Sequence, residues 1–188
     1  EFALKAIEDG CKYAIVDEKK YAIDDRFILV NDVLEALQDL ANYHRKQFTI
    51  PIIAITGSNG KTTTKELIGA ILETTYKTLY TKGNLNNHIG VPLTLLELTK
   101  SHEVGIIEMG ANKPGDIKEL AEIAEPNYGI ITNIGTAHIE GFGSLDGVIS
   151  TKKELYDFIN KVGGQIFINQ EDKLLNDIVP KSVSHIAY

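Results

Sequence analysis

One short run, residues 52–64, constrains the fold of this chain more than any other: an apolar segment leads through a glycine-bounded turn into Lys-Thr-Thr-Thr. It predicts a strand, a tight loop and a helix that begins at about Lys61. Gly57 and Gly60 allow the loop to point successive backbone N–H groups at one anion. The helix adds its free N-terminal donors, Lys61 a mobile cation, and Thr62 a hydroxyl for magnesium. The run therefore predicts a phosphate-binding loop in an α/β fold.

The loop departs from the commonest nucleotide-binding pattern, G-x-x-x-x-G-K-[ST], because Ile55 stands where that pattern has its first glycine. The tighter form T-G-x-x-G-K-T-T remains. An ordinary turn between a strand and a helix is the alternative, but it does not explain why a lysine and three threonines follow at once. The candidate phosphate-binding residues are Gly57, Ser58, Asn59, Gly60, Lys61, Thr62 and Thr63.

The composition limits the partners of this chain. A net charge of −7 without a basic tract argues against a nucleic-acid surface. No apolar run reaches membrane-spanning length, and the N-terminus does not read as a signal peptide. The single cysteine, Cys11, excludes an internal disulfide and fits a reducing cytoplasm. The 188 residues begin in a helix-like stretch without methionine, which predicts a piece of a longer protein.

The pattern of apolar residues predicts two domains, residues 1–48 and 49–188, joined near 47–51. The first should contain a helix at 2–7, strands at 13–16 and 27–30, and an amphipathic helix at 32–45 that Asp32 caps.

From residue 52 onward, strands and helices alternate. Strands are predicted at about 52–56, 76–80, 104–109, 128–133, 165–168 and 183–187, and helices at about 61–74, 90–98, 115–124, 145–161 and 172–178. Strands that are apolar on both faces are typical of a parallel sheet covered by helices. The predicted fold class is therefore α/β: a mostly parallel sheet flanked by helices and carrying the phosphate loop, preceded by the tail of a small α/β domain.

Ligands of such sheets bind beyond the carboxyl ends of the strands, and polar residues follow three of the predicted strands: the phosphate loop, Glu108, and the segment 132–138. A strand-end carboxylate is costly unless it is paired or bound to a metal. Together with Thr62, Glu108 suits a magnesium ion whose other ligands are phosphates and water; a salt-bridged or helix-capping glutamate is the alternative. His138 is a further candidate ligand, although a lone loop histidine is more often merely hydrogen-bonded.

Two other segments contain candidates that chemistry alone does not resolve. Residues 83–92 contain three asparagines before a predicted helix, where the amide of Asn87 could orient phosphate or carboxylate oxygens, or form part of an ordinary turn. Lys152 and Lys153 lie on a predicted helix and are most simply solvated surface charges.

These motifs together resemble the Mur ligase family of ATP-dependent amide-bond ligases. The loop at 56–63 matches the family's phosphate loop, including its departure from the common pattern. The blocks at 83–92, 108–117 and 137–144 are similar, in order and spacing, to the branch that adds D-alanyl-D-alanine to a UDP-linked tripeptide. The resemblance covers essentially the whole chain and is most specific at about 52–158.

The resemblance implies roles for the matching residues. Lys61 would contact the β- and γ-phosphates of ATP, Thr62 and Glu108 would hold a first magnesium ion, and His138 would ligate a second. Lys152, in the matching pattern Lys-x-x-Leu-Tyr, corresponds to a lysine that CO2 carbamylates, so that it could serve beside a metal. Lys61, His138 and Lys152 are thus the implied catalytic residues.

Asn87 would lie near the γ-phosphate and the substrate carboxylate, although His88 departs from the acidic residue that the branch often carries next to it. The implied reaction phosphorylates the terminal carboxylate of UDP-MurNAc-tripeptide, and the amine of D-Ala-D-Ala then attacks the acyl phosphate. This is a cytoplasmic step of peptidoglycan and cell-wall synthesis, and the implied enzyme is a monomer.

Complete members of the family have three domains. By the resemblance, residues 1–48 are the end of the N-terminal UDP-substrate domain and residues 49–188 an incomplete central ATP-binding domain, while the C-terminal domain is absent. The chain is therefore expected to bind nucleotide without completing ligation.

Three alternatives stay open. A sister Mur ligase or a folylpolyglutamate synthase shares the phosphate loop but should lack the Asn-Asn-x-Ile-Gly-Val-Pro and Gly-Phe-Gly-Ser blocks. A non-catalytic nucleotide-binding module should carry a base-specificity motif, and the guanine signature Asn-Lys-x-Asp does not occur. A plain scaffold with incidental glycines would show no difference between this chain and a Lys61→Ala variant in a titration with Mg-ATP.

Overall fold

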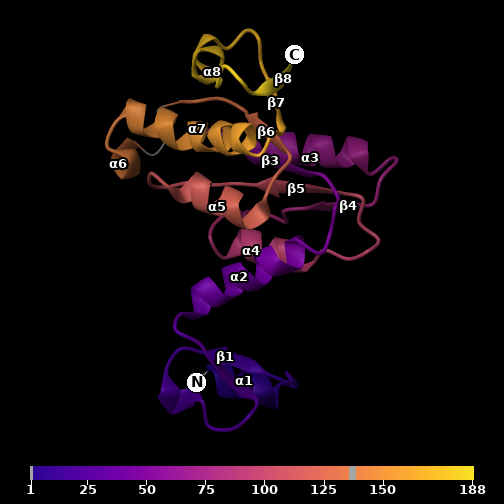
Figure 1. The fold of residues 1–188 in the computed structure, drawn as a ribbon, viewed down its shortest axis with the longest axis vertical. Helices are drawn as coiled ribbons and strands as arrows, with labels where there is room; N and C mark the ends of the chain where they lie inside the picture. Colours follow the sequence, from indigo (N-terminus) through magenta and orange to yellow (C-terminus); the bar gives the residue numbers. More distant parts are fainter. Residues whose placement is uncertain (1, 136–138) are drawn as a thin grey trace. The chain divides into compact units, whose positions relative to one another are not determined.

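The computed structural model describes residues 2–135 and 139–188. The chain divides into two compact units, Glu1–Leu40 and Ala41–Tyr188, and Figure 1 shows their elements coloured along the sequence. The helix α2 (Val33–Arg45) runs across this division.

The first unit contains a small parallel β-pair. It consists of α1 (Phe2–Glu8), β1 (Ala14–Val16), the 3-10 helix η1 (Lys19–Tyr21) and β2 (Phe27–Leu29), and β1 pairs parallel with β2. Its core is formed by Ile7, Ala14, Val16 and Phe27. The predicted helix and strands are therefore present, whereas η1 was not predicted.

Both ends of α2 are fixed by side chains. At the start, Asp32 Oδ1 accepts hydrogen bonds from the backbone N–H groups of Leu34 and Glu35 at 2.7 and 2.9 Å, which confirms the predicted cap. At the end, the Arg45 guanidinium donates to four backbone carbonyls, those of Phe48, Ile50, Ala124 and Glu125. The segment 47–51, where the domain junction is predicted, lies between α2 and β3. Arg45 holds it through hydrogen bonds to the carbonyls of Phe48 and Ile50.

The second unit is built on a six-stranded sheet of order β4-β5-β3-β6-β7-β8, in which every neighbouring pair is parallel. The strands are β3 (Ile52–Thr56), β4 (Thr78–Tyr80), β5 (Val104–Glu108), β6 (Tyr128–Ile131), β7 (Gln165–Ile168) and β8 (Ser184–Ala187). All five residues of β5 are buried. The predicted parallel sheet is confirmed.

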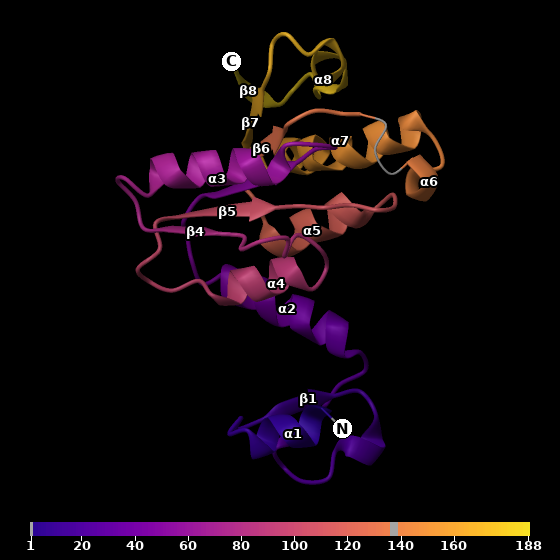
Figure 2. The same cartoon turned by 180° about the vertical axis from the view of Figure 1, so that it is seen from behind.

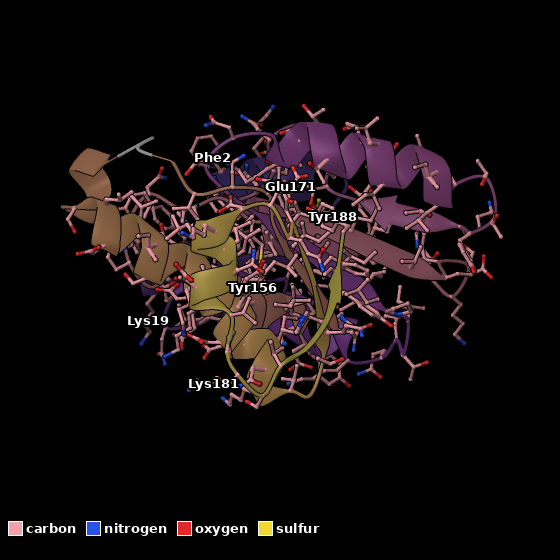
Figure 3. The ribbon with its side chains drawn as sticks, turned by 90° about the horizontal axis from the view of Figure 1, so that it is seen from above. Phe2, Lys19, Tyr156, Glu171, Lys181 and Tyr188 are labelled. Carbon is pink, nitrogen blue, oxygen red and sulfur yellow. The ribbon has the colours of Figure 1, made fainter. Side chains whose placement is uncertain are left out.

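Helices cover both faces of this sheet. Alternate residues of β3 belong to different cores: Ile55 packs in the cluster beneath α3 (Lys61–Leu72), whereas Ile52 and Ala54 join the larger cluster on the other face. That face carries α4 (Gly90–Leu96), α5 (Asp116–Ala124), α7 (Leu145–Lys161) and α8 (Lys173–Ile178). Figures 2 and 3 show α3 separated from α7 by the strands, and Figure 3 labels Tyr156, a fully buried residue of α7.

The connections explain where a ligand can bind. The chain leaves β3 toward the face covered by α3, but it leaves the neighbouring strands β5 and β6 toward the face of α5 and α7. Connections that diverge in this way open a crevice at the carboxyl ends of the strands. The short helix α6 (Ile139–Phe142), which was not predicted, precedes α7 at this end.

Within residues 2–135 and 139–188, no helix combines the length and the apolar character that are needed to cross a membrane.

Candidate functional site

The loop between β3 and α3 has the shape of the predicted cradle. Gly57 has φ 145°, and a Cβ on it would lie 2.0 Å from Thr132 Oγ1, so no other residue fits there without displacement. Gly60 has φ 78° and immediately precedes α3. Both glycines therefore occupy backbone conformations that favour this residue type.

The segment after β6 holds the loop in place. The backbone N–H of Ser58 donates to the Asn133 carbonyl at 3.0 Å, and that of Asn59 donates to Asn133 Oδ1 at 3.1 Å. Asn133 Nδ2 and Thr132 Oγ1 in turn donate to the Asn59 carbonyl. Two of the three predicted polar strand ends are thus in direct contact.

Lys61 begins α3 and bends back over the loop. Its Nζ donates to the carbonyls of Gly57 at 2.7 Å and Ser58 at 3.3 Å. Burial lowers the pKa of Lys61, and the nearby carboxylate of Glu108 opposes this shift. The ammonium is therefore beside the cradle, where phosphate oxygens would lie, and Thr63 is exposed on the same first turn.

The third predicted strand end, Glu108, meets the start of α3. Glu108 is only 1% exposed, and its Oε1 accepts hydrogen bonds from Thr62 Oγ1 at 3.2 Å and Asn86 Nδ2 at 2.7 Å. Its Oε2 is buried without a hydrogen bond, and the Lys65 ammonium lies 3.7 Å away. The Glu108 carboxylate and the Thr62 hydroxyl, which are the predicted magnesium ligands, are thus adjacent. The salt bridge that was the alternative interpretation of Glu108 is present as well, with Lys65.

This donor set fits a magnesium ion. A carboxylate oxygen that lacks a hydrogen bond and a hydroxyl oxygen are hard ligands, as Mg²⁺ prefers. In the described part of the chain, no three His, Cys, Asp or Glu side chains form a group that could hold a metal. Phosphate and water oxygens would therefore have to supply most ligands. His138, the predicted second ligand, lies outside the described residues.

Lys152 is not the solvated surface charge that helix patterning predicts. It is only 3% exposed on α7, and its pKa is lowered to about 8, first by burial and then by the positive charge of Lys61. Its Nζ lies 5.8 Å from the centre of the Phe142 ring. Lys153 is the lysine that faces outward, where it pairs with Asp157.

Lys61 and Lys152 line one cleft of about 290 Å³, together with residues of the connections that follow β3, β4, β5 and β6. Its other lining residues are Gly57, Ser58, Asn84, Asn86, Asn87, His88, Gly110, Ala111, Asn112, Asp116, Glu119, Leu120 and Phe142. Asn87 Oδ1 accepts hydrogen bonds from the backbone N–H groups of Ile89 and Gly90, so the side chain caps α4 at the rim of the cleft.

Two residues of the site were not predicted. Asn86 lies in the singled-out asparagine segment, and its contact with Glu108 could not be distinguished there from a turn. Lys65 is fully buried. The available signal for Lys65 was its position three residues after Thr62, which places both on one side of a helix.

The parallel sheet, the diverging connections and the glycine-bounded loop define the class: a P-loop-containing α/β domain. The family model of the Mur ligase middle domain matches residues 55–188. The chain belongs to the Mur ligase family, as its motifs predict.

Individual relatives agree with this assignment. The UDP-N-acetylmuramoyl-tripeptide--D-alanyl-D-alanine ligase of Haemophilus influenzae is 41% identical over 187 residues, which are 97% of this chain and 40% of that protein. The crystal structure of MurF from Acinetobacter baumannii is 40% identical, with a TM-score of 0.89 over 99% of this chain and 41% of its own. MurF from Thermotoga maritima in complex with ADP is 32% identical, with a TM-score of 0.90, and the match covers 99% of this chain and 43% of the Thermotoga chain. The chain thus spans about 40% of the length of the curated relative from Haemophilus.

Proposed function

We propose that this chain provides the nucleotide-binding part of a ligase that joins D-alanyl-D-alanine to UDP-N-acetylmuramoyl-tripeptide with ATP. The observation that carries the proposal is the meeting of Lys61, Lys152 and the Thr62–Glu108 pair at the carboxyl ends of β3 and β5. The relatives named above, including the Thermotoga MurF complexed with ADP, support the choice of nucleotide and substrates. Residues 1–48 would belong to the domain that binds the UDP-linked substrate, and the enzyme would act in the cytoplasm.

In the first step, the terminal carboxylate of the tripeptide attacks the γ-phosphorus of ATP, and the bond to ADP breaks. The cradle of residues 57–60 orients the phosphates, and the Lys61 ammonium leaves its loop carbonyls to neutralise the charge that develops on the transferred group. The products are an acyl phosphate and ADP.

In the second step, the free amine of D-alanyl-D-alanine attacks the acyl carbon. The C–N bond forms, the amine loses a proton and inorganic phosphate leaves. The acyl phosphate makes this exchange possible because phosphate is a much better leaving group than the hydroxide of a free acid.

Magnesium would be held by Glu108 and Thr62, and it would supply charge neutralisation at the phosphates. Lys152 fits a carbamate, since a pKa of about 8 leaves part of its amine neutral near physiological pH. The neutral Nζ would attack the carbon of CO2 and release one proton. The resulting carbamate anion would be a second anionic oxygen donor in the site, after the carboxylate of Glu108. His138 and Asn87 remain proposed participants, as ligand and orienting amide.

The test is a ligation assay with the full-length protein, ATP, Mg²⁺, UDP-MurNAc-tripeptide and D-alanyl-D-alanine. We expect amide formation with one phosphate released per bond, and hydroxylamine should trap the acyl phosphate when the dipeptide is omitted. Lys61→Ala should abolish turnover and weaken Mg-ATP binding by at least about tenfold.

Lys82→Ala is the matched control, because Lys82 is an exposed lysine that pairs with Glu97 on the surface. Ligation of a single amino acid in place of the dipeptide would instead identify a sister ligase. Equal Mg-ATP affinity of wild type and Lys61→Ala would refute the proposed site.

A further inference from the structure

Lys65 is a fully buried lysine within the candidate site. It lies on α3, and its side chain is 0% exposed, whereas lysine is among the residue types most rarely buried in proteins. Such burial requires compensation, since an ammonium loses its hydration there. The contacts of Lys65 show what provides it.

Three acceptors surround the Lys65 ammonium. Nζ lies 3.1 Å from Oε1 of the partly exposed Glu66, 3.3 Å from the carbonyl of Gly83 and 3.7 Å from Oε2 of Glu108. Lys65 therefore connects α3 with the loop before α4 and with the end of β5. Of its two carboxylate neighbours, only that of Glu108 is buried.

The Glu108 carboxylate needs the Lys65 ammonium as a counter-ion more than the Glu66 carboxylate does, because Glu66 is exposed to solvent and Glu108 is buried. Thr62 and Asn86 donate hydrogen bonds to Oε1, but neither carries a charge. Lys61 also interacts with Glu108, yet its Nζ is hydrogen-bonded to the phosphate loop. Among the described side chains, Lys65 has the only ammonium within 4.0 Å of this carboxylate. A buried carboxylate without a cation is strongly destabilising.

We propose that Lys65 is a positioning residue that stabilises the buried Glu108 carboxylate when no divalent cation is bound, and that it competes with Mg²⁺ for this carboxylate. The inference rests on the proposed function, in which Glu108 is a magnesium ligand. Because Mg²⁺ and the Lys65 ammonium repel each other, Mg²⁺ alone binds weakly to Glu108. Nucleotide phosphates supply the further negative charge that makes magnesium binding favourable.

Thermal unfolding in the absence of nucleotide tests this competition. In EDTA, Lys65→Met should melt roughly 6–20 °C below wild type, because it leaves the Glu108 carboxylate buried without a cation. Excess MgCl2 should restore a clear part of this loss, and NaCl of equal ionic strength should not. Wild type should respond little to MgCl2. A merely structural lysine would lower the melting temperature without any response to magnesium.

Three variants serve as controls. In Lys65→Met/Glu108→Gln the buried charge is gone, so the double variant should be more stable in EDTA than Lys65→Met and indifferent to MgCl2. Lys65→Arg keeps the charge, so MgCl2 should not raise its melting temperature, whatever the larger side chain costs in packing. Lys82→Met removes an exposed lysine and its surface pair with Glu97. It should change neither the melting temperature in EDTA nor the response to MgCl2.

The proposal fails if MgCl2 does not raise the melting temperature of Lys65→Met, or if the double variant is as unstable as the single one. Should Lys65→Met not fold in EDTA, folding on addition of MgCl2, together with a double variant that folds in EDTA, supports the proposal. A double variant that also remains unfolded overturns it. Mg-ATP titration of wild type keeps the two hypotheses apart, since absence of binding there refutes the proposed function instead.

Discussion

Replacement of Lys152 by methionine provides a quantitative test of the electrostatics in the cleft. In the folded protein the pKa of Lys152 is lowered from 10.5 to about 8, chiefly by burial. Between these two values the unfolded state binds more protons than the folded state, so wild-type stability rises with pH in this window. The cost of holding the buried ammonium is fully present below pH 8 and disappears as the pH approaches 10.5. This linkage amounts to about 3.5 kcal/mol at about pH 7 and to about 1.5 kcal/mol at about pH 9.5.

Lys152→Met removes the charge and keeps most of the side-chain volume. Any change in packing is independent of pH, so the informative quantity is the change with pH of the stability difference between variant and wild type. The free energy of unfolding of the variant minus that of wild type should therefore fall by about 2 kcal/mol between about pH 7 and about pH 9.5. Urea unfolding at both pH values measures this quantity, provided that the m-values agree. CO2-depleted buffers are required, because carbamylation would replace the cation by an anion.

Lys153→Met is the matched control, because the neighbouring Lys153 is partly exposed and pairs with Asp157. Its stability difference from wild type should vary little with pH over the same range. If the difference for Lys152→Met is also the same at both pH values, Lys152 is not a buried cation in the folded protein and the reasoning is wrong.

Three further substitutions test the phosphate loop and the starts of two helices. Gly57→Ala should destabilise the protein by about 1–3 kcal/mol and weaken Mg-ATP binding in a titration, because its Cβ would meet Thr132; Gly163→Ala, at φ 69° with open space, should leave binding unchanged. Glu154→Ala should cost about 1–2 kcal/mol in urea unfolding, because its carboxylate accepts hydrogen bonds from the backbone N–H groups of Gly115 and Lys118 at the start of α5. Asp32→Ala should cost about 1 kcal/mol in the same assay through the lost cap of α2.

The sequence predicted the central strands of the sheet because β3, β5 and β6 are buried on both faces. Such strands read as continuous apolar runs, and β3 and β7 were predicted at their observed bounds. Short pieces such as α6, with four residues, contain too little periodicity to be recognised. Strand order was not predicted either, because it depends on pairings between residues far apart in the chain.

The charged residues of the site were predictable only in part. Glu108 stood out because it ends an apolar run, and a carboxylate there needs a partner. Lysines on amphipathic helices usually face solvent, so helix patterning gave no sign of Lys65, and Lys152 was singled out only by the family resemblance. Their burial results from tertiary contacts, as β5 brings Glu108 beside Lys65 and the cleft encloses Lys152.

The position of α3 links the phosphate cradle to the carboxylate. Lys65 follows Lys61 by four positions and Thr62 by three positions in the sequence. These spacings place the three side chains along one side of the helix. One rigid element therefore presents the cation for the phosphates, the hydroxyl beside Glu108 and the counter-ion of that carboxylate. The loop before α3 is fixed by Asn133, and Glu108 is fixed by the hydrogen bond from its backbone N–H to Thr81. A shift of α3 would consequently change phosphate contacts and carboxylate contacts together, and the two cannot be adjusted independently.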